Sequence, residues 1–302
     1  MIARMHTPSS SPATLSVQAL AFGYRRQPLF DALDAHIGQP GIYGLFGRNG
    51  SGKSTLLKLL AGLLTPAGGH VTVGGHTPRA RAADFLASIY LLPEEFHLPN
   101  LTPAQLARSH GGFYPRFSRA LFDAYLAELQ VPVAQRFDGM SLGQKKKATI
   151  AFALATLTPV LLMDEPTNGL DIVSRTQFRQ LMARPEHAAR TVLISTHQAH
   201  DLQSVLGHVW FIDQGQLLLS VSMARLAERL SMGVALSEQA LPGADRLIHQ
   251  EPVGDQWAWV ARRADAQEGA HLLQLELLYK ALSLNQDAVL AALDGLPTEG
   301  RA

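Results

Sequence analysis

The stretch Gly47-Arg48-Asn49-Gly50-Ser51-Gly52-Lys53-Ser54-Thr55 decides the fold class of this 302-residue chain. It matches the phosphate-binding loop pattern G-x-x-x-x-G-K-[ST] at every required position. The apolar run 42–46 before it predicts a buried strand, and the leucine-rich run 56–64 after it predicts a helix. A chance glycine-rich turn is the alternative, but a flanking strand and helix are the context in which this motif binds a nucleoside triphosphate.

Each residue type in this loop has a physical task. Glycines let the backbone curl so that successive N–H groups point at phosphate oxygens. The helix that follows adds the positive end of its dipole at the same place. Lys53 supplies a full positive charge for the β- and γ-phosphates, and the Ser54 hydroxyl is a candidate Mg²⁺ ligand. We therefore expect residues 47–55 to bind the nucleotide.

Composition narrows the classes of function. The 26 basic and 25 acidic side chains give a net charge of +1, so no nucleic-acid partner is expected. The chain has no cysteine, which excludes a disulfide framework and a thiolate metal site. No apolar run approaches the roughly 20 residues that span a bilayer, and the first dozen residues contain no signal-peptide segment. We expect a cytoplasmic protein that reaches a membrane only through a partner.

Strand-like and helix-like runs alternate along most of the chain. This alternation predicts a P-loop α/β fold with a mostly parallel sheet covered on both faces, an N-terminal antiparallel β layer and a helical subdomain. Helices are expected to start at Thr102 and Ser118, and helical segments to separate the strands at 160–163, 191–195 and 209–212. Further strands are expected at 15–21, 32–37, 42–46, 70–75, 89–92 and 216–220.

We divide the chain into three parts. Residues 1–13 are expected to form a disordered tail, 14–221 the nucleotide-binding domain, and 222–302 a small C-terminal accessory domain. In this last part we expect helices at 223–230 and 272–284 and a strand at 257–261. The periodic leucines of the final helix indicate packing or a dimer contact; they are Leu273, Leu277, Leu278 and Leu282.

A pair of acids, Asp164 and Glu165, directly follows the apolar run 160–163. A buried parallel strand delivers both acids to the carboxyl edge of the sheet, where open α/β folds bind ligands. Asp164 suits a role in holding Mg²⁺. Glu165 is then placed to act as the general base that polarises an attacking water. Two solvated acids at a strand end are the alternative, which would be favoured if the run stood without the phosphate loop.

A third polar site follows the apolar run at 192–194, which continues as Ser195-Thr196-His197. An imidazole at this strand end can hydrogen-bond the γ-phosphate and hold the site of the water. A structural or solvated histidine is the alternative. The parallel with Asp164 and Glu165 favours the functional interpretation.

These motifs, in this order, resemble the ATP-binding subunit of ATP-binding-cassette (ABC) transporters over about residues 14–220. The resemblance implies ATP and Mg²⁺ as cofactors, and 47–55 as the Walker A loop. It implies that Asp164 and Glu165 are the Walker B aspartate and the catalytic glutamate. It further implies that Tyr24 stacks on the adenine, that Asp171 belongs to the D-loop and that His197 is the switch histidine.

The segment 140–144 falls where this family carries its signature, usually LSGGQ. The resemblance implies that Ser141, Gly143 and Gln144 close over the nucleotide of a second ATP-binding subunit, in a homodimer or a heterodimer. Ser141 as the simple N-cap of a helix beginning at 142–149 is the alternative. Leu142 stands where the signature usually has glycine.

One further position, at residue 94, departs from the usual pattern of this family. Glu94 stands where the family carries the Q-loop glutamine. A glutamate keeps an oxygen for Mg²⁺ but adds a negative charge and removes a donor. The run 145–147 consists of three lysines, which on a helix point in different directions. They predict a solvated or partly dipole-opposed basic turn instead of a nucleic-acid patch.

The resemblance also implies a function. The helical subdomain, about 94–158, would carry at 94–138 a groove for the coupling helix of a separate membrane permease. The segment 113–117 and the helical stretch after it resemble the exporter-type ATPases of the bacitracin- and acetoin-operon-like group. We therefore expect an ATP-hydrolysing subunit, peripheral at the inner face of the cell membrane, that energises export. The alternative is a soluble ABC-type ATPase of a cofactor-assembly or translation-factor system, although translation factors of this kind usually carry two cassettes in one chain.

Overall fold

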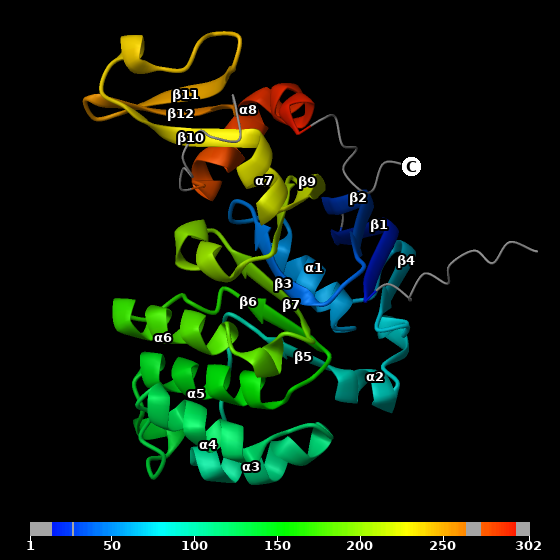
Figure 1. The fold of residues 1–302 in the computed structure, drawn as a ribbon. Coiled ribbons are helices and arrows are strands. Elements are labelled where there is room, and N and C mark those ends of the chain that lie inside the picture. Colours follow the sequence, from blue (N-terminus) through cyan, green and yellow to red (C-terminus); the bar gives the residue numbers. More distant parts are fainter. Residues whose placement is uncertain (1–13, 26, 264–272, 294–302) are drawn as a thin grey trace, which may run out of the picture.

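The computed structural model describes residues 14–25, 27–263 and 273–293. Figure 1 shows a central sheet with α3, α4 and α5 gathered at one end of the molecule and the small sheet of β10, β11 and β12 at the other. The tail expected at 1–13 lies outside the described residues.

A six-stranded sheet forms the centre of the molecule, with the strand order β5-β6-β7-β3-β8-β9. Strands β5 to β8 run parallel to their neighbours in this order, and β9 runs antiparallel to β8. The predicted mostly parallel sheet is therefore confirmed. Its strands are β3 (Gly41–Phe46), β5 (Ile89–Leu92), β6 (Val160–Asp164), β7 (Thr191–Thr196), β8 (His208–Asp213) and β9 (Gln216–Ser222).

The two faces of this sheet enter two separate hydrophobic cores. In β6, Val160 and Leu162 pack in the core that contains α1, whereas Leu161 and Met163 pack in the core that contains α5. Every residue of β6 and β7 is buried, as a parallel sheet covered on both faces requires. The α-helices that precede β7 in the chain are α1 (Lys53–Leu60), α2 (Ala83–Ser88), α3 (Pro103–His110), α4 (Arg119–Glu128), α5 (Leu142–Ala155) and α6 (Ile172–Met182).

The expected antiparallel layer is a three-stranded sheet with the order β2-β1-β4. Its central strand pairs antiparallel with both neighbours, and its apolar side chains join the core that contains α1. The layer thus covers the same face of the central sheet as α1. Its strands are β1 (Leu15–Tyr24), β2 (Gln27–Ile37) and β4 (Gly68–Val73).

Both expected helix starts between the sheet strands are confirmed by their caps. The Thr102 hydroxyl accepts a hydrogen bond from the Gln105 N–H (3.3 Å), and the Gln105 side chain accepts one from the Thr102 N–H (2.8 Å). This capping box begins α3. The Ser118 hydroxyl accepts from the Leu121 N–H (3.2 Å) and begins α4 in the same way.

The connection between β7 and β8 differs from the expectation. In place of a longer helical segment it contains two single turns of 3₁₀ helix, Ala199–Asp201 and Gln203–Val205. Short turns suffice here because β8 pairs with β3 and the chain has only to cross one strand of the sheet. These turns lie directly after His197, so they shape the segment that carries the expected switch histidine.

The accessory part contains more strands than the sequence predicts. The expected helix and strand are α7 (Met223–Arg229) and β12 (Gln256–Arg262), and the final helix, α8 (Leu275–Ala292), starts later and runs further than expected. Two strands were not predicted, β10 (Leu230–Ala235) and β11 (Leu247–Val253), which flank β12 in an antiparallel sheet. Gly233 weakens the strand pattern of β10 in the sequence. Glycine stands there because an added Cβ would lie 2.8 Å from the Trp259 ring.

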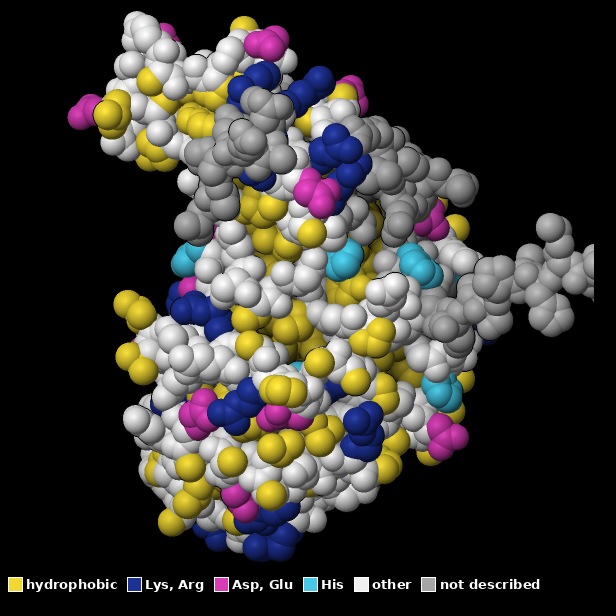
Figure 2. All heavy atoms as spheres, viewed as in Figure 1, with side chains coloured by type: hydrophobic (Ala, Val, Ile, Leu, Met, Phe, Trp, Pro, Cys, Tyr) yellow, Lys and Arg dark blue, Asp and Glu magenta, His cyan; other side chains and the backbone are white. Residues whose placement is uncertain are grey.

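The final helix packs against its own chain. The four leucines expected in this helix are all buried and belong to the same hydrophobic core as α5 and β8, although Leu273 lies just before the first residue of α8. Figure 2 shows apolar side chains gathered at the neck between the accessory part and the body of the molecule, and basic and acidic side chains interspersed on this face. Of the two roles expected for these leucines, the structure shows packing within the chain.

Candidate functional site

The phosphate-binding loop joins β3 to α1, as predicted. Gly52 has φ +109° and forms the N-cap of α1, a conformation that favours glycine. At Gly47 an added Cβ would lie 2.3 Å from the Ile212 carbonyl oxygen, so the loop needs glycine there for close packing. The Lys53 ammonium is buried and donates to the carbonyls of Gly47 (2.8 Å) and Arg48 (3.1 Å). Lys53 is therefore held over the inner side of the loop.

The two acids lie at the carboxyl edge of the sheet, as predicted. Asp164 ends β6 and pairs in register with Ser195 of β7. The Ser195 hydroxyl donates to Asp164 Oδ1 at 2.5 Å, which fixes this carboxylate. Burial lowers the pKa of Lys53, and the negative charges of Glu165 and Asp164 raise it again. The ammonium and the two carboxylates therefore form one electrostatic unit.

Glu165 is held in a strained backbone conformation and keeps one side-chain oxygen free. Its φ is +44°, in the left-handed region that non-glycine residues rarely adopt. Its Oε1 accepts from His197 Nδ1 (2.9 Å) and lies 3.9 Å from the Lys53 ammonium. Its Oε2 is buried and has no hydrogen-bond partner among the described residues. A buried acceptor without a partner is rare, and here it points to a ligand or water that belongs to the site.

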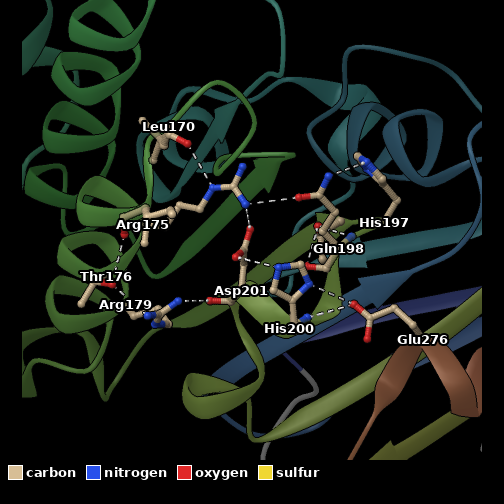
Figure 3. Close-up of polar contacts among 11 residues, drawn as sticks. Leu170, Arg175, Thr176, Arg179, His197, Gln198, His200, Asp201 and Glu276 are labelled. Atoms are coloured by element: carbon tan, nitrogen blue, oxygen red, sulfur yellow. Dashed lines mark hydrogen bonds and ion pairs between the residues drawn. The ribbon is translucent and has the colours of Figure 1, made fainter. Parts of the chain in front are cut away.

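His197 is placed by a polar network that sequence reasoning missed (Figure 3). Its Nε2 lies 3.3 Å from the Gln198 side-chain nitrogen, and the Gln198 oxygen lies 3.4 Å from Arg175 Nη1 of α6. Arg175 also donates to the Leu170 carbonyl (3.1 Å) and forms an ion pair with Asp201 (2.6 Å). Gln198 and Arg175 match no motif, so only the folded chain reveals that they hold the histidine.

The accessory part touches this site at two points. The Glu276 carboxylate of α8 accepts from the His200 N–H (3.0 Å), three residues after the expected switch histidine. The Tyr279 hydroxyl accepts from the Arg48 N–H (3.4 Å) in the phosphate-binding loop. The Arg48 side chain donates two hydrogen bonds to the Asp213 carboxylate, at 3.1 and 3.0 Å, in a bidentate contact. Helix α8 therefore contacts both the loop and the segment after β7.

Tyr24 lies beside the start of α1. Its ring is about half exposed, at 49%, and packs edge-on against Phe22 with centroids 5.0 Å apart. Its hydroxyl is 3.2 Å from the Thr55 hydroxyl. The structure thus places an accessible aromatic face next to the loop, and its stacking on adenine stays a prediction.

The signature segment starts α5, and Ser141 is the N-cap there. Its hydroxyl accepts from the Gln144 N–H (3.2 Å), and the Gln144 side chain accepts from the Ser141 N–H (2.9 Å). Gly143 lies beside the expected D-loop, because its added Cβ would be 3.6 Å from the Gly169 carbonyl oxygen. Asp171 caps α6 through the Ser174 N–H (2.8 Å), and hydrogen bonds from Ser174 lower the pKa of Asp171. The local capping interpretation is confirmed, and the contact with a second subunit stays a prediction.

Lys146 contradicts the expectation of a solvated basic turn. Its side chain is 3% exposed, and its ammonium donates to the carbonyls of Glu94 (3.3 Å) and Glu165 (3.2 Å). The expectation was wrong because α5 packs across the sheet edge. That packing turns one of three consecutive lysines inward, while Lys145 and Lys147 stay partly exposed.

The residues expected to hold Mg²⁺ offer oxygen ligands. They are the Asp164 carboxylate, the Ser54 hydroxyl and the Glu94 carboxylate, whose Oε1 accepts from the Asn168 side chain (2.9 Å). Mg²⁺ prefers oxygen ligands and takes most of its six from water and substrate phosphates, so such a set fits. The described residues contain no cluster of three or more histidine or acidic side chains that would bind a metal without a substrate.

Comparison with known proteins agrees with this geometry. Residues 30–168 match the ABC transporter family. The chain contains an ABC transporter ATP-binding domain. This ABC domain spans both the loop around Lys53 and the acids at 164–165. Among the described residues, no helix is both long and apolar enough to cross a membrane.

Relatives of this chain match it well beyond the loop. The bacitracin transport ATP-binding protein BcrA of Bacillus licheniformis is 28% identical over 245 residues, which cover 76% of this chain and 80% of the relative. The daunorubicin/doxorubicin resistance ATP-binding protein DrrA of Streptomyces peucetius is 28% identical over 302 residues, covering 90% and 89%. The match to DrrA therefore includes most of the accessory part.

Solved structures share the fold. An ATP-binding subunit of an ABC transporter superposes with a TM-score of 0.64 at 23% identity, covering 70% of this chain and 91% of that one. A dimeric post-hydrolysis ATP-binding cassette with ADP and Pi superposes with a TM-score of 0.61 at 20% identity, covering 69% and 98%. The predicted fold class is confirmed by both.

Proposed function

We propose that this chain is the ATP-binding and ATP-hydrolysing subunit of an ABC transporter and energises a separate membrane permease for export. The observation that carries the proposal is the assembly of Lys53, Asp164, Glu165 and His197 at one sheet edge. There Glu165 Oε2 is buried and has no partner in the part of the chain that the structure describes. The relatives support the direction of transport, since their names refer to bacitracin transport, drug resistance and Nod factor export.

The geometry supports a division of labour within the chain. The amides of the loop and the Lys53 ammonium grip the triphosphate tail, and Tyr24 contacts the adenine. Glu165 accepts a proton from the attacking water at Oε2, while His197 and Lys53 hold the Oε1 side of the same carboxylate. Mg²⁺, held through Ser54, Asp164 and Glu94, would neutralise charge on the phosphates.

A second ATP-binding subunit completes the site in this proposal. Ser141, Gly143 and Gln144 at the start of α5, with Asp171 at the start of α6, would close over the nucleotide of that subunit. Support comes from the apolar side chains around them, which are well exposed: Leu142 (70%), Ile172 (84%) and Val173 (67%). Apolar exposure concentrated at two helix starts favours a contact with another chain.

The helical part at 94–158 would face the permease, with its 94–138 segment forming the groove. Phe113 in this segment is 70% exposed, which fits a contact that the isolated chain leaves open. Such docking would place the chain on the cytoplasmic side of the membrane, as a peripheral subunit. Residues 222–302 would act as an accessory domain clamped to the ATPase part by α8.

The proposal is tested by nucleotide binding, turnover and co-purification. Lys53→Ala is expected to lower the affinity for ATP at least tenfold, because a buried charge aimed at the phosphates is lost. Lys58→Ala, an exposed lysine of the same helix, is the matched control and should bind ATP like the parent chain. Parental affinity of Lys53→Ala would contradict the site.

The transporter assignment needs a separate measurement. A membrane protein encoded beside this chain should co-purify with it from detergent and raise its ATP turnover. Turnover without any membrane partner, together with co-purification of a soluble assembly complex, would favour the alternative of a soluble ABC-type ATPase.

A further inference from the structure

Lys146 is a buried cation whose surroundings differ from those of an ordinary ion pair. Among the described residues its two hydrogen-bond acceptors are main-chain carbonyls, those of Glu165 and Glu94. Its ammonium lies 5.7 Å from the centre of the Phe96 ring. Burying a charge costs free energy unless nearby groups compensate it. Here burial lowers the pKa of Lys146, and the nearby charges of Glu94, Asp164 and Glu165 raise it. The nearby carboxylates therefore offset part of the cost of burying the Lys146 charge.

These contacts form a closed ring of hydrogen bonds. The Lys146 ammonium donates to the carbonyls of Glu94 (3.3 Å) and Glu165 (3.2 Å). The Asn168 N–H donates to the same Glu165 carbonyl (3.2 Å), and the Asn168 side chain donates to Glu94 Oε1 (2.9 Å). Three segments far apart in the sequence, at 94, 146 and 165–168, are thereby tied together at the sheet edge.

The ring acts on the strained residue of the site. Glu165 has φ +44°, and a strained backbone persists only where neighbours fix it from more than one side. The Glu165 N–H donates to the Ser195 carbonyl (3.1 Å) and lies 3.2 Å from the Ser195 hydroxyl. The Glu165 carbonyl accepts from Lys146. The main-chain groups on both sides of the Glu165 Cα are therefore held, and with them the direction of its carboxylate.

We propose that Lys146 is a positioning residue for ATP hydrolysis, whose ammonium aims the Glu165 carboxylate and ties the Glu94 segment to it. This inference rests on the proposed function, because it assumes that Glu165 is the base. It also gives Glu94 a structural task, since both its carbonyl and its carboxylate belong to the ring. A shift of the segment after β5 would pull on Lys146 and so on the base.

The test compares Lys146→Met in two backgrounds, the parent chain and Glu165→Gln. Methionine keeps the length and apolar stem of lysine and removes the charge and the donors. In the parent background we expect kcat to fall at least tenfold while KM for ATP changes less than threefold. In the Glu165→Gln background, followed by single-turnover hydrolysis, we expect a further loss of less than twofold, because a residue that acts through Glu165 has nothing left to position. Lys58→Met is the matched control, with parental kinetics expected.

A second readout does not depend on turnover. Hydrogen exchange of the Asn168 amide, which shares the Glu165 carbonyl with Lys146, should become at least tenfold faster in Lys146→Met, whereas amides in β7 should stay unchanged. If Lys146→Met does not fold, Lys146→Leu replaces it, since leucine also removes the charge and the donors.

Two outcomes for Lys146→Met would overturn the inference. One is parental kcat for Lys146→Met together with a strongly impaired Glu165→Gln, which would leave the proposed function standing. The other is an equal loss in both backgrounds, which would show that Lys146 acts independently of the base. If Glu165→Gln itself hydrolyses ATP at the parental rate, the proposed function fails at its base, and the inference fails with it.

Discussion

The two ends of the central sheet hold buried charges in opposite ways. At the amino ends of β6 and β7, Arg190 is 1% exposed and each of its guanidinium nitrogens has a protein partner. At the carboxyl ends of the same strands, Glu165 is 4% exposed, yet its Oε2 has no hydrogen-bond partner among the described residues. The polar contacts at one end therefore satisfy a buried charge, whereas the other end leaves a buried acceptor without a partner among the described residues.

Partner atoms explain the difference. Arg190 donates to the carbonyls of Thr158 (2.7 Å) and Leu154 (3.0 Å) and to the Thr158 hydroxyl (3.1 Å). Burial lowers the pKa of Arg190 to about 10, but these oxygens still surround the charge. Glu165 combines a strained backbone with a half-satisfied carboxylate. Such residues cluster at functional sites, where the surrounding structure carries their cost.

The largest expected effect is a loss of activity at the carboxyl ends of the strands. Glu165→Gln should lower kcat about 10²- to 10⁴-fold, because general-base catalysis contributes that much. Its urea midpoint should match or exceed that of the parent chain, since a buried charge is removed. Turnover assays and urea unfolding monitored by circular dichroism measure both. If Glu165→Gln instead lost stability and kept its turnover, Glu165 would serve the fold and not catalysis.

The next effect is expected at the opposite end of the sheet. Arg190→Met should lower the free energy of unfolding by about 3 kcal/mol, since it leaves buried carbonyls without a donor. Turnover per folded molecule, measured well below the unfolding transition, should stay within twofold of the parent chain. A fall in kcat comparable to that of Glu165→Gln, without a loss of stability, would mean that this end also serves catalysis.

His187, which contacts Arg190, makes the stability of this end of the sheet depend on pH. Arg190 donates to Nδ1 of His187 (3.1 Å), and Tyr125, which donates its own proton to Glu186 (2.8 Å), faces Nε2 at 3.3 Å. His187 is therefore neutral, with its proton on Nε2. Burial, and secondarily the charge of Arg190, lower the pKa of His187 from 6.5 to about 4.

The direction in which stability changes with pH follows from proton binding at His187. Between pH 6.5 and about 4 the unfolded chain binds a proton at this histidine and the folded chain does not, so stability falls as the pH falls. The loss amounts to at most about 3 kcal/mol. Urea unfolding at pH 7 and pH 4.5 should show a smaller difference for His187→Gln than for the parent chain. His70→Gln, an exposed histidine, is the control, and an equal pH slope in both variants would refute the assignment.

The smallest effect concerns the contact of α8 with the segment after His197. Glu276→Gln weakens a partly exposed contact with His200, so stability should change by less than about 1 kcal/mol. Turnover should change less than threefold. Glu238→Gln, an exposed acid in the same accessory part, is the control. A tenfold change in kcat for Glu276→Gln alone would show that α8 governs the site more strongly than its contacts indicate.

The sequence was sufficient where the chemistry is local. The loop around Lys53, the strand-end acids, His197 and the caps at Thr102 and Ser118 all lie in short patterns, and the structure places each on the predicted kind of element. The residues that hold them could not be found this way. Ser195 meets Asp164 across 31 residues, and Tyr279 meets Arg48 across 231. Such contacts depend on strand register and on the docking of α8.

The same reasoning explains the errors in the sequence interpretation. The side-chain direction of Lys146 depends on which face of α5 packs against the sheet edge, and three consecutive lysines give no periodicity that shows it. The strands β10 and β11 are short and contain Gly233 and Pro252, residues that weaken a strand pattern. Tertiary contacts decide both cases.

The most direct test of the central claim is the mass of Glu165→Gln in solution, measured by light scattering with and without Mg-ATP. If Lys53 grips the triphosphate from one chain and the Ser141 segment of a second copy caps it, the mass should double with Mg-ATP and return to that of one chain when the nucleotide is removed. Adding Lys53→Ala should abolish the doubling. A variant that binds Mg-ATP tightly and keeps the mass of a single chain at every protein concentration would contradict the account for a pair of identical chains.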